Sequence, residues 1–186
     1  MDPVEIAGVI TALAAVGLAA KEHILNWPAA IVSSGMYVVV FLRSNLYGDM
    51  ALQLFYIVMS IYGWYFWLKG DNKKESHIAN CKSQTVRNLL VISVCGFVAA
   101  LFLLKKTDSN VPYLDAFTTV SSLAGTWMLA KKFIENWLVW IVTDIVSVGM
   151  YTYKMLYATA FLYFILVVMA VYGYFEWRKT MNLRAS

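Results

Sequence analysis

The chain has 186 residues, of which 61% are hydrophobic and 14% are charged, and its formal net charge is +4. A soluble domain is about half apolar and about a quarter charged, so this composition excludes an ordinary soluble domain and indicates lipid as the solvent. The small excess of positive charge also argues against nucleic-acid binding, which calls for a basic patch on a soluble fold.

Seven apolar runs of about 17–22 residues follow one another along the chain. They cover residues 4–20, 27–43, 47–68, 86–104, 114–130, 137–153 and 157–177. About 20 apolar residues cross a hydrocarbon core of ~30 Å, and runs of this length without alternating polarity are typical of helices. The sequence therefore predicts an all-α polytopic membrane protein with seven transmembrane helices.

Lysine and arginine predict the orientation of these helices. With seven spans and the N-terminus outside, 11 of the 15 Lys and Arg residues fall on the inner side. The others are Arg43, Lys105, Lys106 and Lys154. Because inner loops are enriched in basic residues, we expect the N-terminus outside and the C-terminus inside. The start MDPVEIAG lacks the basic region of a signal peptide, so we expect a mature N-terminus.

The chain contains an internal repeat. KEHILNW at 21–27 aligns with KKFIENW at 131–137, and IYGWYFWLK at 61–69 aligns with VYGYFEWRK at 171–179. NLY at 45–47 and MLY at 155–157 share the same offset of 110 residues. Residues 5–69 and 115–179 are thus two copies of one three-helix unit, which is informative about the architecture.

The number of crossings predicts how the two copies are oriented. Three crossings invert the chain, and the unmatched run at 86–104 adds a fourth crossing that restores the orientation. We therefore expect a 3+1+3 architecture with parallel repeats, as in the SWEET transporters. The predicted domains are a first repeat at 1–70, a loop and linker helix at 71–112, a second repeat at 113–180 and a tail at 181–186.

Polar side chains recur on one face of the sixth predicted helix. They are Asn136, Trp140, Asp144, Ser147 and Tyr151, whose repeat counterparts are Asn26, Ala30, Ser34, Tyr37 and Phe41. Their spacing of three or four residues puts them on one face at 3.6 residues per turn. Only the second copy carries the large ring and the acid. Such a face is a poor lipid surface, so we expect it to point into the bundle.

Asp144 is the strongest single indication of function, because an ionisable residue inside a membrane costs roughly 2.5–3.5 kcal/mol and is a functional hypothesis by default. Three roles are open. Asp144 faces a cationic ligand, or carries a proton, or serves as a structural hydrogen-bonding group between helices.

The third predicted helix offers a second group of candidates. Gln53 lies about two turns into an apolar run, and a buried amide requires hydrogen-bond partners, from a ligand or from a neighbouring helix. Tyr56 and Trp64 follow on the same face. Trp137, at the start of the sixth predicted helix, is either an interface residue or a ring that stacks on a ligand.

Several kinds of chemistry lack a motif in this sequence. It has no phosphate-binding G-x-x-x-x-G-K-[ST] loop, neither histidine stands in a metal-binding spacing, and no nucleophile–base pair is evident. We therefore expect no cofactor, no metal ion and no enzymatic activity.

Four segments together resemble the Pnu family of bacterial vitamin transporters. They are ENWLVWIVTDIVSV at 135–148, DAF at 115–117, IYGWYFW at 61–67 and LQLF at 52–55. The resemblance covers about residues 4–180. It implies facilitated uptake of nicotinamide riboside across the bacterial inner membrane, trapping by a cytoplasmic kinase and a homotrimer. It also implies ligand contacts at Gln53, Asn136, Trp137 and Trp140.

The choice of vitamin stays open at this point. Members of the Pnu family also take up thiamine or riboflavin, and some nicotinamide riboside members have an amide where this chain has Asp144. Nicotinamide riboside and thiamine both carry a fixed positive charge on a ring, so either suits Asp144 better than riboflavin does. Nicotinamide riboside is the leading expectation. The alternatives are thiamine, another small solute, a non-transporting receptor or scaffold, and a membrane enzyme.

Overall fold

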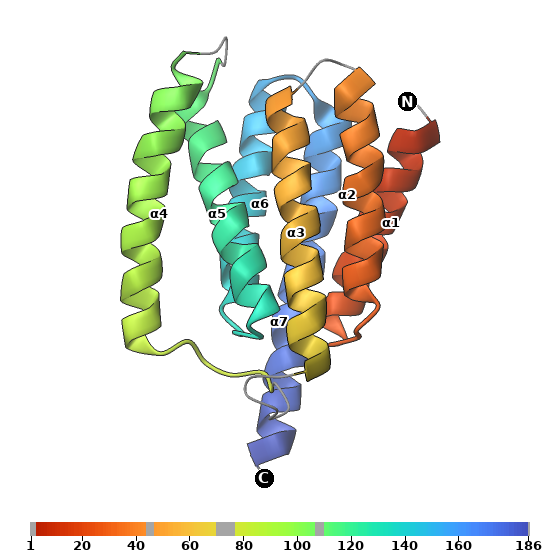
Figure 1. Ribbon diagram of the computed structural model, residues 1–186, viewed down its shortest axis with the longest axis vertical. Helices are drawn as coiled ribbons and strands as arrows, with labels where there is room; N and C mark the ends of the chain where they lie inside the picture. The colour runs from red at the N-terminus through yellow and green to blue at the C-terminus, as the bar shows by residue number, and fades with distance from the viewer. Residues whose placement is uncertain (1–2, 44–46, 70–76, 107–109, 186) are drawn as a thin grey trace. The chain divides into compact units, whose positions relative to one another are not determined.

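The computed structural model describes residues 3–43, 47–69, 77–106 and 110–185. Over these residues the chain forms seven α-helices (Figure 1). They are α1 (Pro3–Ala20), α2 (Asn26–Arg43), α3 (Tyr47–Lys69), α4 (Ser83–Leu104), α5 (Pro112–Ala130), α6 (Asn136–Tyr153) and α7 (Tyr157–Ala185). The prediction of an all-helical chain is confirmed.

Each predicted apolar run coincides with one helix, and the bounds differ by at most three residues except at the end of α7. The apolar run ends at residue 177, whereas α7 continues to Ala185. Lys and Arg are good helix formers, and no Gly or Pro follows residue 177 to end the helix. Apolarity therefore defines the segment suited to lipid, and not the full length of the helix.

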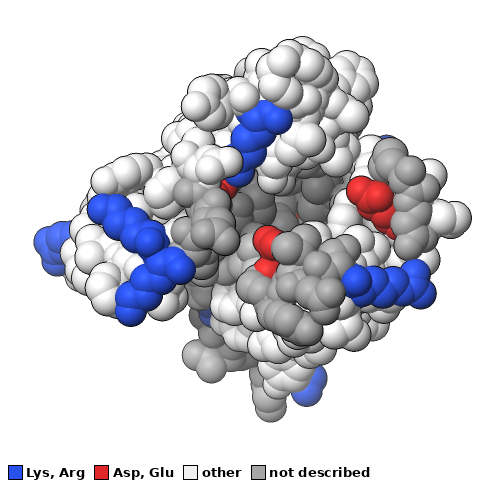
Figure 2. Space-filling model, turned by 90° about the horizontal axis from the view of Figure 1, so that it is seen from above, with Lys and Arg blue, Asp and Glu red and all other residues white. Residues whose placement is uncertain are grey.

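Four of the described helices are long and apolar enough to cross a membrane by length and composition: α1, α3, α4 and α7. The helices α2, α5 and α6, with 18, 19 and 18 residues, are not among these four. On the face shown in Figure 2, charged side chains are few and scattered among uncharged ones.

The chain forms two compact units, each described by itself. The first unit comprises Met1–His77 and Ala130–Lys132, and the second comprises Ile78–Leu129 and Phe133–Ser186. In the first unit α2 packs against both α1 and α3 (Figure 1). In the second unit α6 packs against α7, and Gly96 of α4 faces Val120 of α5, whose methyl groups lie 3.6 Å from where a Cβ at Gly96 would be.

The turns after α1 and α5 have the same backbone geometry. Glu22 and Lys132 have φ angles of 54° and 56°. The backbone N–H of His23 donates to Leu18 O at 2.9 Å, and that of Phe133 donates to Met128 O at 3.0 Å, as in the left-handed helix termination that glycine favours. A residue other than glycine in this conformation costs roughly 1–2 kcal/mol, so something else in the structure must stabilise these turns.

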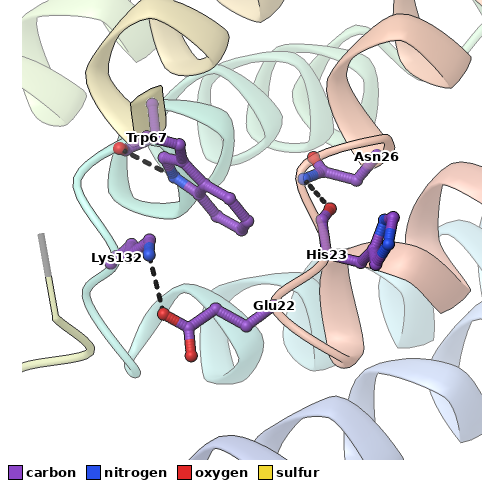
Figure 3. Close-up of polar contacts among 6 residues, drawn as sticks. Glu22, His23, Asn26, Trp67 and Lys132 are labelled. Atoms are coloured by element: carbon purple, nitrogen blue, oxygen red, sulfur yellow. Dashed lines mark hydrogen bonds and ion pairs between the residues drawn. The ribbon is translucent and has the colours of Figure 1, made fainter. Parts of the chain in front are cut away.

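An ion pair joins the two turns. Nζ of Lys132 lies 2.7 Å from Oε1 of Glu22, with side chains only 9% and 15% exposed (Figure 3). Nζ of Lys132 also lies 4.6 Å from the centre of the Trp67 ring, and Nε1 of Trp67 donates to Ala130 O at 3.2 Å. The turn after α5 is thus held by α3 and by the turn after α1, which explains why residues 130–132 belong to the first unit.

A corner of two tryptophans and a glycine links α2 to α3 in the first unit. Trp27 and Trp67 meet edge to face, with ring centres 5.3 Å apart and an interplanar angle of 88°. A Cβ at Gly63 would lie 2.4 Å from Cη2 of Trp27, so only glycine leaves room for this ring.

The second unit contains the same corner between α6 and α7. Trp137 and Trp177 meet edge to face at 5.5 Å and 90°, and a Cβ at Gly173 would lie 2.7 Å from Cη2 of Trp137. The two glycines and the tryptophans are each 110 residues apart. The repeated letters N-W, Y-G and W therefore encode a packing arrangement that both copies share.

The loop before α4 is attached to the turn before α6 within the second unit. The backbone N–H of Cys81 donates to both carboxylate oxygens of Glu135 at 3.0 Å, and Ala79 O accepts from the N–H of Ile134 at 3.1 Å. Burial raises the pKa of the Cys81 thiol, and the negative charge of Glu135 raises it further.

Candidate functional site

The predicted polar face of α6 begins at Asn136, directly after the turn. Nδ2 of Asn136 donates to Phe133 O at 2.7 Å, and the residue is fully buried. Its Oδ1 has no hydrogen-bond partner among the described residues. A buried acceptor without a partner is uncommon and requires an explanation, such as a bound molecule that donates to it.

Trp137 packs in the corner with Trp177 and Gly173 and is 2% exposed. Its counterpart Trp27 is packed in the same way, and Nε1 of each ring lacks a partner among the described residues. Trp137 is therefore a packing residue shared by both copies, and a ligand contact by Trp137 stays a prediction.

Trp140 follows one turn later and is only partly buried. Its indole ring lies against Gly125 of α5: a Cβ at Gly125 would be 3.1 Å from Cε2 and 3.2 Å from Nε1 of the ring. This close approach was not predicted. The repeat alignment contains a signal for it, because the counterparts of Gly125 and Trp140 are Ala15 and Ala30.

Asp144 is 4% exposed, and its carboxylate has no hydrogen-bond or ion-pair partner among the described residues. Its neighbours Thr143 and Ser147 are also buried, but their hydroxyls donate to backbone carbonyls of α6, at 2.8 Å to Val139 O and 2.9 Å to Thr143 O. Such bonds satisfy a hydroxyl within its own helix. Asp144 differs from its neighbours because it is left without such a local partner.

An aromatic pair and an ion pair follow towards the end of α6. Tyr151 stacks on Tyr163 of α7, with ring centres 5.2 Å apart and an interplanar angle of 16°. Nζ of Lys154 lies 3.3 Å from Oδ1 of Asp115 on α5. Tyr163 and the ion pair were not among the predicted site residues, although Tyr163 is the repeat counterpart of Gln53.

The candidates on α3 belong to the first unit. Gln53 and Tyr56 are partly buried, and Tyr56 meets Phe55 edge to face at 6.2 Å between ring centres. Trp64 is 37% exposed. A contact of these three residues with the same ligand as α6 stays a prediction.

The described residues contain no group of three or more His, Cys, Asp or Glu side chains that could hold a metal ion. This region of the second unit offers an aromatic face at Trp140, a buried carboxylate one turn away at Asp144, and hydrogen-bonding groups at Asn136 and Tyr151. These groups suit a flat, positively charged solute.

Three comparisons with known proteins agree with this description. The profile of the nicotinamide mononucleotide transporter family matches residues 2–179. The nicotinamide riboside transporter PnuC of Escherichia coli (strain K12) is 24% identical, over 98% of this chain and 88% of that protein. The riboflavin/roseoflavin transporter RibM of Streptomyces davaonensis is 23% identical, over 93% of this chain and 83% of that protein.

A crystal structure of the vitamin B3 transporter PnuC has the same fold. It superposes with a TM-score of 0.74 and 23% identity, covering 95% of this chain and 80% of the other. With several apolar helices and this similarity along nearly its whole length, the chain is a multi-pass membrane protein. It belongs to the nicotinamide mononucleotide transporter family.

Proposed function

We propose that the chain is a membrane facilitator for nicotinamide riboside, which crosses the bilayer down its own gradient. The observation that carries the proposal is Asp144, a buried carboxylate without a partner among the described residues, one turn from the ring of Trp140. Nicotinamide riboside has a positive charge fixed on an aromatic ring. The name of the relative from Escherichia coli supports the same substrate.

Each side chain has a role in this proposal. Trp140 stacks on the nicotinamide ring, with a cation–π contribution of ~1–2 kcal/mol once water is excluded. Asp144 balances the ring charge. Oδ1 of Asn136, which has no partner among the described residues, accepts a hydrogen bond from the carboxamide or the ribose. The other ligand contacts in this proposal are Gln53, Tyr56, Trp64, Trp137, Ser147 and Tyr151.

The architecture that we propose for this function is 3+1+3, with parallel repeats similar to those of the SWEET transporters. Its support is the offset of 110 residues that separates the bounds of α2 from those of α6, the start of α3 from that of α7, the left-handed turns, and the tryptophan corners. The N-terminus lies outside and the C-terminus inside the bacterial inner membrane, as the basic residues predict. The functional assembly is a homotrimer.

Uptake in this proposal needs no energy-coupling site in the chain. A cytoplasmic kinase phosphorylates the riboside after entry, and the added charge prevents its return. The sequence contains no P-loop motif, which is consistent with uptake that does not use ATP in this chain.

Thiamine is the second candidate, because Asp144 and Trp140 suit any flat ring with a fixed positive charge. The relative from Streptomyces davaonensis is named for riboflavin. Riboflavin is neutral and would leave the buried carboxylate of Asp144 without a counter-charge.

Uptake by proteoliposomes that contain the purified chain tests the proposal. We expect radiolabelled nicotinamide riboside to equilibrate across the membrane without added ATP or ion gradients. If only thiamine equilibrates, the proposed substrate is wrong and the proposed mechanism of facilitated uptake stands. Binding without any uptake would indicate a receptor. The absence of both binding and uptake would contradict the proposal.

A further inference from the structure

The packing of Trp140 depends on a glycine in the neighbouring helix. Gly125 is buried near the middle of the C-terminal half of α5. A Cβ built there would lie 3.1, 3.2 and 3.5 Å from Cε2, Nε1 and Cδ2 of the Trp140 indole. Contacts of 3.0–3.4 Å are tighter than nine in ten real Cβ contacts, so the ring would have to move by a few tenths of an ångström.

The two copies differ at this pair of positions together. The first copy has Ala15 on α1 and Ala30 on α2, whereas the second has Gly125 on α5 and Trp140 on α6. Glycine destabilises a helix by about 1 kcal/mol relative to alanine. The second copy therefore carries the residue that stabilises a helix less, at a position where the methyl group of alanine would crowd the indole ring of Trp140.

We propose that Gly125 is a positioning residue, which fixes the indole ring of Trp140 at the depth where a flat cationic ring stacks on it. This inference rests on the proposed function. Gly125 does not touch the substrate, and it acts only through the space that it leaves for Trp140.

Stacking depends strongly on the position of the ring. The clash of an added methyl group would fall on the edge where the two indole rings are fused and on Nε1. A displacement of a few tenths of an ångström changes the separation between Trp140 and its ligand on the scale at which dispersion contacts are lost. The partial exposure of Trp140 allows the ring to give way, so the chain still folds.

The test compares Gly125→Ala with Gly149→Ala, a matched control because nothing lies within 4 Å of a Cβ at Gly149 on α6. Calorimetry should show that Gly125→Ala weakens nicotinamide riboside binding about fivefold, the equivalent of ~1 kcal/mol of stacking. Gly149→Ala should change the affinity by less than about twofold.

A double-mutant cycle isolates the action through Trp140. In a Trp140→Phe background, Gly125→Ala should change the affinity by less than about twofold, because the smaller ring leaves room for the methyl group. An equal loss of affinity in both backgrounds would overturn the inference.

Fluorine NMR of the fluorotryptophan-labelled protein gives a readout that needs no ligand. The Trp140 resonance, assigned by its loss in Trp140→Phe, should shift in Gly125→Ala and stay in place in Gly149→Ala. An unshifted resonance in Gly125→Ala would overturn the inference. A shift in a protein that binds neither riboside nor thiamine would contradict the proposed function, while the positioning role of Gly125 would stand.

Discussion

The two copies of the three-helix unit share the same tryptophan–glycine corner, and they differ along one helix face. In both, a tryptophan pair at right angles packs over a glycine, and a left-handed residue ends the preceding helix. The faces of α2 and α6 diverge. At equivalent positions α2 has Ala30 and Ser34, whereas α6 has Trp140 and Asp144.

This difference separates residues needed for folding from residues available for function. Packing requirements are the same in both copies, so the shared corners are attributed to stability. A tryptophan and a buried carboxylate that only α6 carries add nothing that α2 needs in order to fold. Substitutions in the corners should therefore act on stability, and substitutions on the α6 face should act on substrate binding.

The largest expected effect breaks the shared corner. Gly173→Ala brings a Cβ to 2.7 Å from Cη2 of Trp137, a ring that is 2% exposed and has little room to move. We expect a loss of about 3 kcal/mol of stability, at the upper end for an overpacked core. The melting temperature in detergent measures it.

Gly63→Ala should have a similar effect at the first corner, since its Cβ would lie 2.4 Å from Cη2 of Trp27. Gly35→Ala is the control, because nothing lies within 4 Å of its Cβ. Unchanged melting temperatures for both corner variants would show that the corners are not structural.

A somewhat smaller effect is expected at the turns. Lys132→Met removes the Lys132 ion pair from the mostly buried carboxylate of Glu22, which lies in a left-handed turn. We expect about 2 kcal/mol of destabilisation, below the value for fully buried pairs because Glu22 retains some contact with water. Thermal unfolding of Lys132→Met, Glu22→Gln and the double variant checks this. Strictly additive losses would mean that the two side chains do not interact.

The third prediction concerns the face that differs between the copies. Asp144→Asn should weaken nicotinamide riboside binding about tenfold, or ~1.4 kcal/mol, while the melting temperature changes little. Ser34→Ala, at the equivalent position of α2, should change the affinity by less than about twofold. Calorimetry together with thermal unfolding separates the two effects. Equal loss of binding and of stability in Asp144→Asn would assign Asp144 a structural role.

The smallest effect concerns Glu135, whose counterpart in the first copy is Leu25. Burial of Cys81 and, to a smaller extent, the charge of Glu135 raise the pKa of the thiol, so less reactive thiolate is present at a given pH. In a Cys95→Ser background, Glu135→Gln should lower that pKa and speed maleimide labelling about two- to threefold at pH 8.

Labelling of Cys81 should also become faster as the pH rises in both proteins, because the thiolate is the reacting form. The pH at which labelling is half-maximal should be lower in Glu135→Gln. An unchanged half-maximal pH would show that Glu135 does not act on the thiol.

Much of the fold could be predicted from the sequence because lipid imposes a simple rule. Apolar runs of membrane-spanning length predicted seven helices, and the only large departure is the end of α7, where charged residues continue the helix beyond the apolar segment. The repeat was visible because corner residues such as Trp27 and Trp137 recur at a fixed offset.

The candidate site was less predictable, because it depends on neighbours that are distant in the sequence. The burial of Asp144 was expected, because it lies on a polar face of the sixth predicted helix that is a poor lipid surface. Nothing in the spacing along α6 indicated that Gly125 of α5 accommodates Trp140, or that Lys154 pairs with Asp115. Trp137 was ambiguous for the same reason, and only its packing against Gly173 identifies its structural role.

Calorimetry with two forms of one ligand tests whether the face of α6 selects a flat cation. Nicotinamide riboside carries a positive ring, and its reduced form has nearly the same shape without the charge. We expect the wild-type chain to bind the charged form about tenfold more tightly, and Asp144→Asn to remove most of this preference. Equal affinities of the wild-type chain for both forms would contradict it.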